Sequence, residues 1–167
     1  EGIMMSETHY KDGKLDGVCT EWCQDGTKIE EHYKDGKKEG VETKWYEDGT
    51  MMSETHYKND ELDGVETKWY EDGTKSMETH YKDGKEDGVS TTWNEDGYKE
   101  SELHYKDGKL DFETGWYEDG NKERESHYKN GKREGVETTW DEDGIKWGES
   151  HYKNGELDGV STWWYKD

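Results

Sequence analysis

Proline is absent from this chain of 167 residues, and no long apolar run occurs in it. Only 26% of the residues are hydrophobic, whereas 40% are charged. By composition alone this indicates a disordered chain, because too little apolar surface is available to offset the entropy lost on folding. No segment has the length of a membrane-spanning helix or the pattern of a signal peptide, so we expect no membrane insertion.

Cysteine is also scarce, with only Cys19 and Cys23 in the chain. Four positions apart on an extended strand, they would lie about 13 Å from each other, which is too far for a mutual disulfide bond. They are therefore free thiols, partners in an intermolecular bond, or substitutions for Glu and Tyr in a degenerate repeat.

Positive charge is outnumbered, because 23 Lys and Arg face 44 Asp and Glu, for a formal net charge of −21. This charge disfavours nucleic acid and anionic membranes as direct partners, since both require basic residues to neutralise phosphate. It is consistent with a solvated acidic surface, with cation binding, or with a basic protein partner.

Aromatic residues are abundant, and the nine Trp and twelve Tyr fall at fixed phases of a repeat. A fixed period of this size indicates a repeat architecture, and aromatic side chains bury much area each, so we expect a folded chain. The whole of residues 1–167 reads as a single repeat array. Its seven units, 23 or 24 residues apart, begin near His9, His32, His56, His80, His104, His127 and His151.

Each unit contains two strand-like segments and two Asx-Gly turns, which we expect to form three-residue hairpin loops such as 34–36 and 47–49. The pattern predicts an all-β fold, an elongated and twisted antiparallel meander of seven β-hairpin repeats. With these loops Trp45 pairs with Met51, and alternation places Trp45, Val41 and Tyr57 on one face. Glu54 and His56 then lie on the opposite face.

Two repeats are one residue short, and both admit the same repair of this register. A two-residue loop at Asp25-Gly26 compensates for the first deletion. A two-residue loop at Asp107-Gly108 compensates for the second and places Phe112 opposite Leu103. The turn 59–61, where Asp replaces Gly, is predicted to be the least regular, because Asp tolerates the left-handed conformation less well than Gly.

Units such as WYEDGTKSMETHYKDGKEDG resemble the MORN-repeat variant found in tandem in bacterial antitoxin-like proteins. This resemblance covers the whole chain and implies β-hairpin arrays used as scaffolds or binding surfaces, with no shared catalytic residues. The Trp-Tyr-x-x-Gly element is also similar to choline-binding cell-wall repeats, which place several aromatic side chains around a cationic ligand.

A Glu-x-His pair in every repeat is a candidate metal site, represented by Glu54 with His56 and by Glu78 with His80. Histidine with carboxylate suits zinc or copper. Successive pairs lie about 10 Å apart on the sheet, however, and each supplies only two ligands. The alternative is a solvated ladder of charges and hydrogen bonds. Acidic turns, most nearly 141–149, resemble calcium loops, so weak calcium binding is the one cofactor interaction we consider.

The aromatic side chains are predicted to form two columns on one face of the sheet. We expect them to make the core, and because a single layer cannot cover its own apolar face, the sheet must curl over it or dock a second surface. Trp147 and Trp163 fall outside these columns, so some aromatic area should be exposed near the C-terminus. The columns are Trp22, Trp45, Trp69, Trp93, Trp116, Trp140 and Trp164, and Tyr10, Tyr33, Tyr57, Tyr81, Tyr105, Tyr128 and Tyr152.

No catalytic constellation occurs in these repeats, so we predict a non-enzymatic structural protein that associates head to tail with its own copies. Glu1-Gly2 and Asp167 occupy one phase of the cycle, so we expect either a slice of a longer array or ends that meet other copies. The lack of an initiator Met is consistent with a mature or trimmed product. A filament or surface fibre would place the chain outside the cell or at its surface. The alternative is an antitoxin or immunity module whose acidic surface binds a basic protein. The predicted interaction residues are Ile3, Met5, Val160, Trp163, Trp164 and Tyr165.

Overall fold

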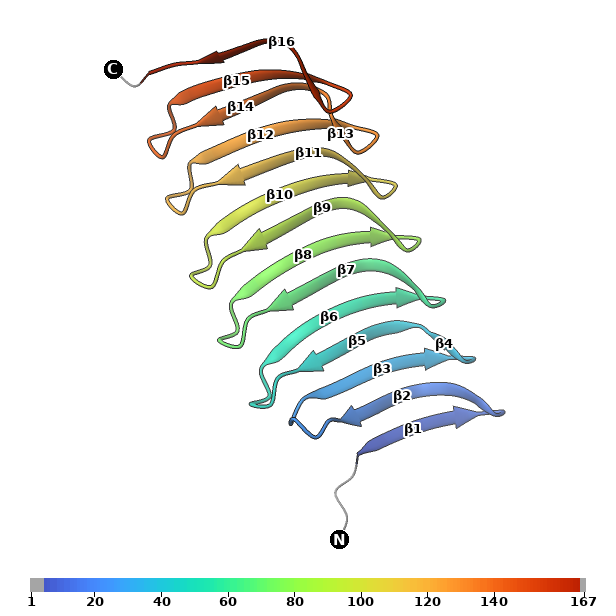
Figure 1. Cartoon of the computed structure of the whole chain (residues 1–167). Coiled ribbons are helices and arrows are strands. Elements are labelled where there is room, and N and C mark those ends of the chain that lie inside the picture. Colours follow the sequence, from blue (N-terminus) through green and yellow to red (C-terminus); the bar gives the residue numbers. More distant parts are fainter. Residues whose placement is uncertain (1–4, 166–167) are drawn as a thin grey trace. The chain divides into compact units, whose positions relative to one another are not determined.

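The computed structural model describes residues 5–165, and every regular element among them is a β-strand. The chain divides into two compact units, unit 1 with residues 1–85 and unit 2 with residues 86–167. Within each unit the strands pair antiparallel in the order in which they follow along the chain (Figure 1). The predicted all-β hairpin meander is therefore confirmed.

Unit 1 contains β1 to β8, and unit 2 contains β10 to β16 together with nearly all of β9, which begins at Lys85. The short β4 and β13 pair with β3 and β12, and each is continued after one residue by the next strand. The strands are β1 (Ser6–Lys11), β2 (Lys14–Trp22), β3 (Lys28–Lys34), β4 (Lys37–Lys38), β5 (Gly40–Trp45), β6 (Met51–Lys58), β7 (Glu61–Trp69), β8 (Lys75–Lys82), β9 (Lys85–Trp93), β10 (Lys99–Lys106), β11 (Lys109–Trp116), β12 (Lys122–Lys129), β13 (Lys132–Arg133), β14 (Gly135–Trp140), β15 (Lys146–Lys153) and β16 (Glu156–Trp163).

The first turn of each repeat is a two-residue hairpin turn, not the three-residue loop that we predicted. Lys34 pairs with Lys37, and the two residues between them have φ angles of 51° and 89°. Positive φ at both central positions matches the right-handed twist of the strands, and Asx-Gly tolerates it. The turn at Asn59 and Asp60 is equally regular, with φ angles of 51° and 73°, so its predicted irregularity was wrong. The Asp60 carboxylate accepts a hydrogen bond from the Lys38 N–H at 2.8 Å.

A glycine bulge follows this turn. Between the pairs Tyr57–Leu62 and Thr55–Glu66, β6 advances by two positions whereas β7 advances by four. Gly64 has a φ of 121°, and a Cβ there would lie 2.9 Å from the His56 Cβ. Glycine is thus required both for the backbone conformation and for the close approach of the histidine side chain.

A second bulge follows the wider loop and reverses the predicted faces. Trp45 pairs with Met51 as expected, but Lys44 then pairs with Ser53, because Met52 is an extra residue in β6. Val41 consequently pairs with His56. Trp45 and His56 lie on the same face, whereas Tyr57 lies on the other, so our assignment of the faces was wrong. Beyond a one-residue bulge, every side chain of the bulged strand lies on the face opposite to the one that it would occupy without the bulge.

Each of the two short repeats lacks one residue of a bulge. Its strands can therefore still pair in the same antiparallel meander. In the first, the wide loop is retained, with the Cys23 N–H donating to the Thr27 carbonyl at 2.9 Å, and β2 pairs with β3 without a shift. In the second, the glycine bulge shrinks, so Phe112 pairs with His104 and not with Leu103. The two-residue loop predicted at Asp25-Gly26 is therefore wrong. The one predicted at Asp107-Gly108 is present, because Lys106 pairs with Lys109, but it does not place Phe112 opposite Leu103. The antiparallel meander that both loops supported is right.

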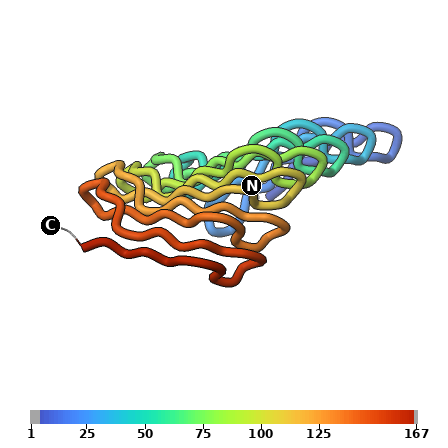
Figure 2. Tube along the Cα trace, turned by 90° about the horizontal axis from the view of Figure 1, so that it is seen from above, coloured from blue at the N-terminus to red at the C-terminus, as the bar shows by residue number. Residues whose placement is uncertain are grey.

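No apolar side chain is buried among the described residues. Short hydroxyl side chains are buried instead, with Thr79 at 2% and Ser126 at 1% exposure. Neither unit curls its sheet over one face or docks a second layer on it, and Figure 2 shows the strands from β12 to the C-terminus as one layer. Our expectation of an aromatic core under a curled or covered face was wrong, because aromatic residues are divided between two solvated faces.

Two strand glycines in unit 2 allow a test of the packing. A Cβ at Gly148 would lie 2.4 Å from the Thr139 Oγ1 and 2.5 Å from the Trp163 ring, whereas at Gly115 the nearest atom is 3.5 Å away. We expect Gly148→Ala to lower the free energy of unfolding by about 1–3 kcal/mol through overpacking. Gly115→Ala, as the matched control, should change it by less than about 0.5 kcal/mol. Urea denaturation measures both, and equal effects would contradict the packing described.

Candidate interaction surfaces

The face that carries Trp45, Val41 and His56, and the corresponding residues of the other repeats, is called the tryptophan face. Here a lysine joins two neighbouring strands. The Lys28 Nζ lies 4.3 Å from the centroid of the Trp45 ring and 3.1 Å from a carboxylate oxygen of Glu30. In unit 2, Lys99 repeats this arrangement with Trp116 at 4.4 Å and Glu102 at 2.9 Å. Lysine stems thus cover the indole rings while their charges are neutralised in place.

The histidines of this face are held by backbone hydrogen bonds. The Nδ1–H groups of His32 and His56 donate to the carbonyls of Val41 and Val65 at 2.6 and 2.8 Å. The Nε2 atom faces the glutamate two residues earlier, at 2.9 Å between His104 and Glu102. The Glu-x-His pairs therefore form part of the ladder that we considered as the alternative to metal binding.

The candidate metal residues Glu54, His56, Glu78 and His80 belong to this ladder. Glu54 pairs with Thr43 on one side and with Thr67 on the other, so a short hydroxyl residue separates it from the next glutamate. In the part of the chain that the structure describes, no three His, Cys, Asp or Glu side chains converge as metal ligands would.

The acidic turns direct a carboxylate at their own backbone. Asp48 Oδ1 accepts a hydrogen bond from the Thr50 N–H at 2.8 Å, and this bond lowers the pKa of the Asp48 carboxyl. Asp25 is held in the same way by the side chain and backbone of Thr27, and its pKa is also lowered. Weak calcium binding by these turns remains a prediction.

The opposite face, called the tyrosine face, carries Tyr33, Tyr57 and the second set of glutamates. The Lys38 Nζ lies 2.5 Å from both Glu31 and Glu42, and 4.9 Å from the centroid of the Tyr57 ring. Glu42 is 6% exposed. Burial, followed by the hydrogen bond to Glu31, raises the pKa of Tyr33 to about 12. In unit 2, Arg133 takes the place of the lysine, 3.1 Å from Glu137 and 5.3 Å from the Tyr152 ring.

The predicted aromatic columns exist, but they lie on different faces. Their inner members are half-buried, and the outermost ones, Tyr10 at 66% and Trp164 at 45%, are exposed. The half-buried members are Trp22, Trp45, Trp69, Trp93, Trp116 and Trp140, and Tyr33, Tyr57, Tyr81, Tyr105, Tyr128 and Tyr152.

The predicted interaction residues that the structure describes lie in β16 or directly beside the edge strands β1 and β16. Every residue of β1 is exposed, and β16 is exposed except at Thr162. The rings of Trp163 and Trp147 are in contact, with centroids 4.8 Å apart and planes inclined by 48°, and both remain exposed. Ile3 lies outside the described residues. The exposed fractions of the others are Met5 58%, Val160 69%, Trp163 56%, Trp164 45% and Tyr165 99%.

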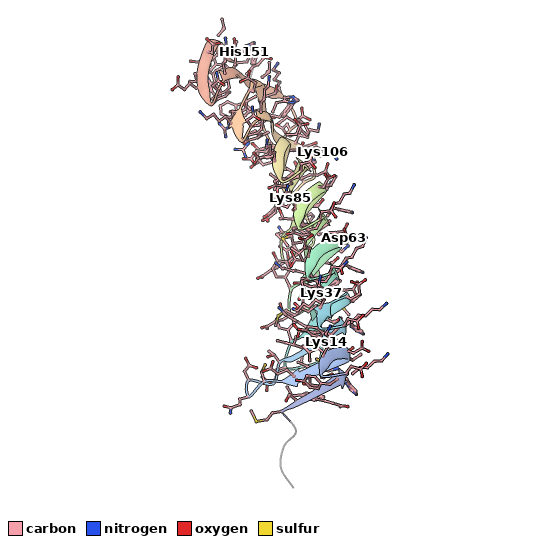
Figure 3. The ribbon with its side chains drawn as sticks, turned by 90° about the vertical axis from the view of Figure 1, so that its right-hand side faces the viewer. Lys14, Lys37, Asp63, Lys85, Lys106 and His151 are labelled. Carbon is pink, nitrogen blue, oxygen red and sulfur yellow. The ribbon has the colours of Figure 1, made fainter. Side chains whose placement is uncertain are left out.

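Successive repeats are also joined at both ends of their strands. At the tight turns, the Gly36 N–H donates to the Leu15 carbonyl at 2.7 Å, and the Asp35 N–H donates to the Asp16 carboxylate at 3.3 Å. Figure 3 looks onto this edge, where Lys14, Lys37 and Asp63 mark three successive repeats of unit 1. At the wide loops, the Tyr46 hydroxyl donates to the Trp69 carbonyl at 2.8 Å.

Hollows along the wide loops were not predicted from the sequence. The hollow in unit 1 has a volume of about 570 Å³ and lies beside Asp25, Tyr46 and Glu71. The hollow in unit 2 has a volume of about 710 Å³ and lies beside Asn94, Trp116 and Glu142. The sequence offers a signal for the hollow of unit 2, because the tyrosine that follows Trp in four of the seven repeats is replaced by Asn94 there.

A family model described as MORN repeat variant matches four segments that together make up just over half of the chain: residues 38–59, 62–83, 113–130 and 133–154. A comparison with curated proteins finds no match. Among the described residues, no helix has the length and apolar character needed to cross a membrane.

Lys38 offers a test of the tyrosine face. We expect Lys38→Met to lower the free energy of unfolding by about 1–2 kcal/mol, because the buried Glu42 then keeps only Lys44, at 3.0 Å, as a cationic partner. Lys106→Met is the control, since Lys106 pairs with Asp87 at 3.0 Å but its side chain is 72% exposed. That variant should change stability by less than about 0.5 kcal/mol in urea denaturation. Equal losses would contradict a role for burial.

Glu102 offers a test by pH. The hydrogen bond from Lys99 lowers its pKa below the usual 4.5, so the contact stabilises the folded state above that pH and is lost as pH falls through the folded-state pKa. Glu102→Gln should therefore melt about 1–3 °C below the wild type at pH 7. The two melting temperatures should converge below the folded-state pKa. A difference that persists at pH 3 would show that the side chain acts through packing instead.

Proposed function

Because the chain belongs to the MORN repeat variant family, whose members are generally non-enzymatic, we propose that it is a structural repeat protein that associates head to tail with its own copies. Strand β16 of one copy pairs with β1 of the next, and repetition of this contact builds a filament or a surface fibre. The observation that carries the proposal is the exposure of these two edge strands.

The edges lack the features that usually protect an open sheet. The chain contains no proline, and no loop or helix covers β1 or β16 among the described residues. Tyr10 on β1 is 66% exposed and Val160 on β16 is 69% exposed, whereas Tyr33 and Val41 at the same phases inside unit 1 are half-buried. A further strand at each edge would cover these side chains as their neighbours are covered.

The two edges have matching registers. β16 occupies the phase of β2, and β1 occupies the phase of β3, which are neighbours in unit 1. By analogy with the pairing of Val18 and His32, Val160 would pair with His9 of the next copy. Trp163 would then face Ser6, a small residue, just as it faces Gly148 within its own chain.

The outward hydrogen-bonding groups of both edges can be assigned. On β16, the Trp164 N–H donates to the Trp147 carbonyl at 2.9 Å, so by alternation Thr162 points inward and Ser161 points outward. On β1, the Met5 carbonyl accepts from the Trp22 N–H at 2.9 Å, so Thr8 points outward. Ser161 and Thr8 therefore present free backbone groups to a neighbouring copy.

Proline substitutions at these positions test the proposal. We expect the wild-type chain to assemble as salt rises, because screening reduces the repulsion between copies of charge −21. Ser161→Pro and Thr8→Pro each remove one outward N–H and should remain monomeric. Mixed in equal amounts, they should form a dimer and nothing larger, because each keeps one intact edge and the contact is heterologous. Light scattering and electron microscopy measure the products.

Thr162→Pro is the control for folding, because it removes an inward N–H and should lower the melting temperature without testing the edge. A wild-type chain that stays monomeric across the salt series, or a mixture that forms no dimer, would contradict head-to-tail association. A basic protein partner would then be the better function, as in an antitoxin or immunity module. The acidic hollows of the wide loops favour that alternative.

A further inference from the structure

The hollow in unit 2 forms where a bridging tyrosine is missing. The Tyr117 hydroxyl donates to the Trp140 carbonyl at 2.9 Å and thereby joins two successive wide loops. Asn94 stands at the equivalent position one repeat earlier, where its shorter side chain does not reach the Trp116 carbonyl; its Oδ1 accepts a hydrogen bond from the Tyr98 N–H of its own loop at 2.9 Å. A groove of about 710 Å³ remains between the loops, within the usual size range of ligand sites.

Aromatic rings form part of the wall. Trp116 and Tyr117 line the groove, together with Tyr98, which is 50% exposed. Tyr98 stands where three other repeats have Thr27, Thr50 and Thr74. This replacement adds a large, partly exposed ring at the position where the repeat pattern calls for a small side chain.

Carboxylates form the rest of the wall. The groove is lined by Glu100, Glu118, Asp119, Glu123 and Glu142, and its only cationic lining residue is Lys99. The Lys99 ammonium is already bound to Glu102 at 2.9 Å and lies 4.4 Å from the Trp116 ring centroid. Gly115, which precedes Trp116, occupies the position held by Lys44 and Lys68 in two repeats of unit 1, so it adds no cationic side chain beside the groove.

We propose that this groove binds an arginine side chain of an extended basic peptide segment in a partner protein. A planar guanidinium stacks on aromatic rings and donates hydrogen bonds from its edge to carboxylates, so it fits this combination of walls. The carboxylates are spread around the groove, and no three of them converge as a metal site within residues 5–165, which favours an organic cation over a metal ion. None of the groove residues belongs to β1 or β16, so this inference is independent of head-to-tail association.

Asn94→Tyr tests the groove without changing the net charge. The new hydroxyl should reach the Trp116 carbonyl, as Tyr46 reaches Trp69, and fill the space. The probe is a fluorescein-labelled tetra-arginine peptide, measured by anisotropy in 150 mM salt at a protein concentration that light scattering shows to be monomeric. We expect Asn94→Tyr to weaken binding at least tenfold. Cys23→Tyr makes the same charge-neutral change at the equivalent position of a unit 1 repeat; it is the matched control and should bind like the wild type.

A second pair of variants serves if Asn94→Tyr does not fold by thermal melting. Glu100→Gln/Glu123→Gln should weaken peptide binding at least fivefold, whereas Glu47→Gln/Glu71→Gln, with the same change of charge in the hollow of unit 1, should not. Equal effects of the two pairs, or of the two tyrosine variants, would show that the peptide responds to overall charge and overturn the proposal. Displacement of the peptide by equimolar calcium would assign the groove to a metal ion and overturn it as well.

Discussion

Hydrogen bonds between successive turns hold this protein together, because no apolar side chain is buried among its described residues. Most tight turns donate to the strand that follows the preceding tight turn, as the Gly36 N–H does to the Leu15 carbonyl. The wide loops are joined by tyrosine hydroxyls such as that of Tyr46. The backbone hydrogen bonds of the strands lie between the tight turns and the wide loops. A hairpin on its own would have neither a core nor a neighbouring turn, so each repeat depends on the next one for its stability.

This arrangement also explains how a chain with 40% charged residues can fold. The centres of both faces are filled by short residues, such as Thr79 on the tyrosine face and Thr114 on the tryptophan face, which the stems of longer side chains cover. Charges then alternate above them, as Lys38 does between Glu31 and Glu42. The acidic residue before each glycine bulge has a structural task too, because Asp16 accepts the backbone N–H of the next tight turn. Much of the charge is therefore part of the fold, and the remainder is available for partners.

The sequence was sufficient to predict the period, the strands and the pairing of Trp45 with Met51, but not which residues share a face. Register is usually visible because apolar residues lie on one side of a sheet, and here both sides are solvated and mixed. Nothing in Met52 marks it as a bulge residue; only the comparison with β2 and β3, which lack it, shows its effect. The loop hollows escaped prediction for another reason. Replacement of a tyrosine by Asn94 matters only once that tyrosine is known to bridge two loops.

Each position of a repeat protein can be compared with the same position in the other repeats. This comparison distinguishes the two proposed surfaces, which are the edge strands and the groove. The edges β1 and β16 differ from inner strands in exposure and hardly at all in sequence, so they offer the pairing that the fold itself uses. The groove at Asn94 differs in sequence, since Asn94, Tyr98 and Gly115 all depart from the pattern within one pair of repeats. The fold needs none of these departures, because the other repeats form the same strands without them. The replacement by Asn94 leaves a hollow, and the replacement by Tyr98 adds an aromatic ring to its wall. Together they alter what the surface can bind, while the ladder beneath stays unchanged.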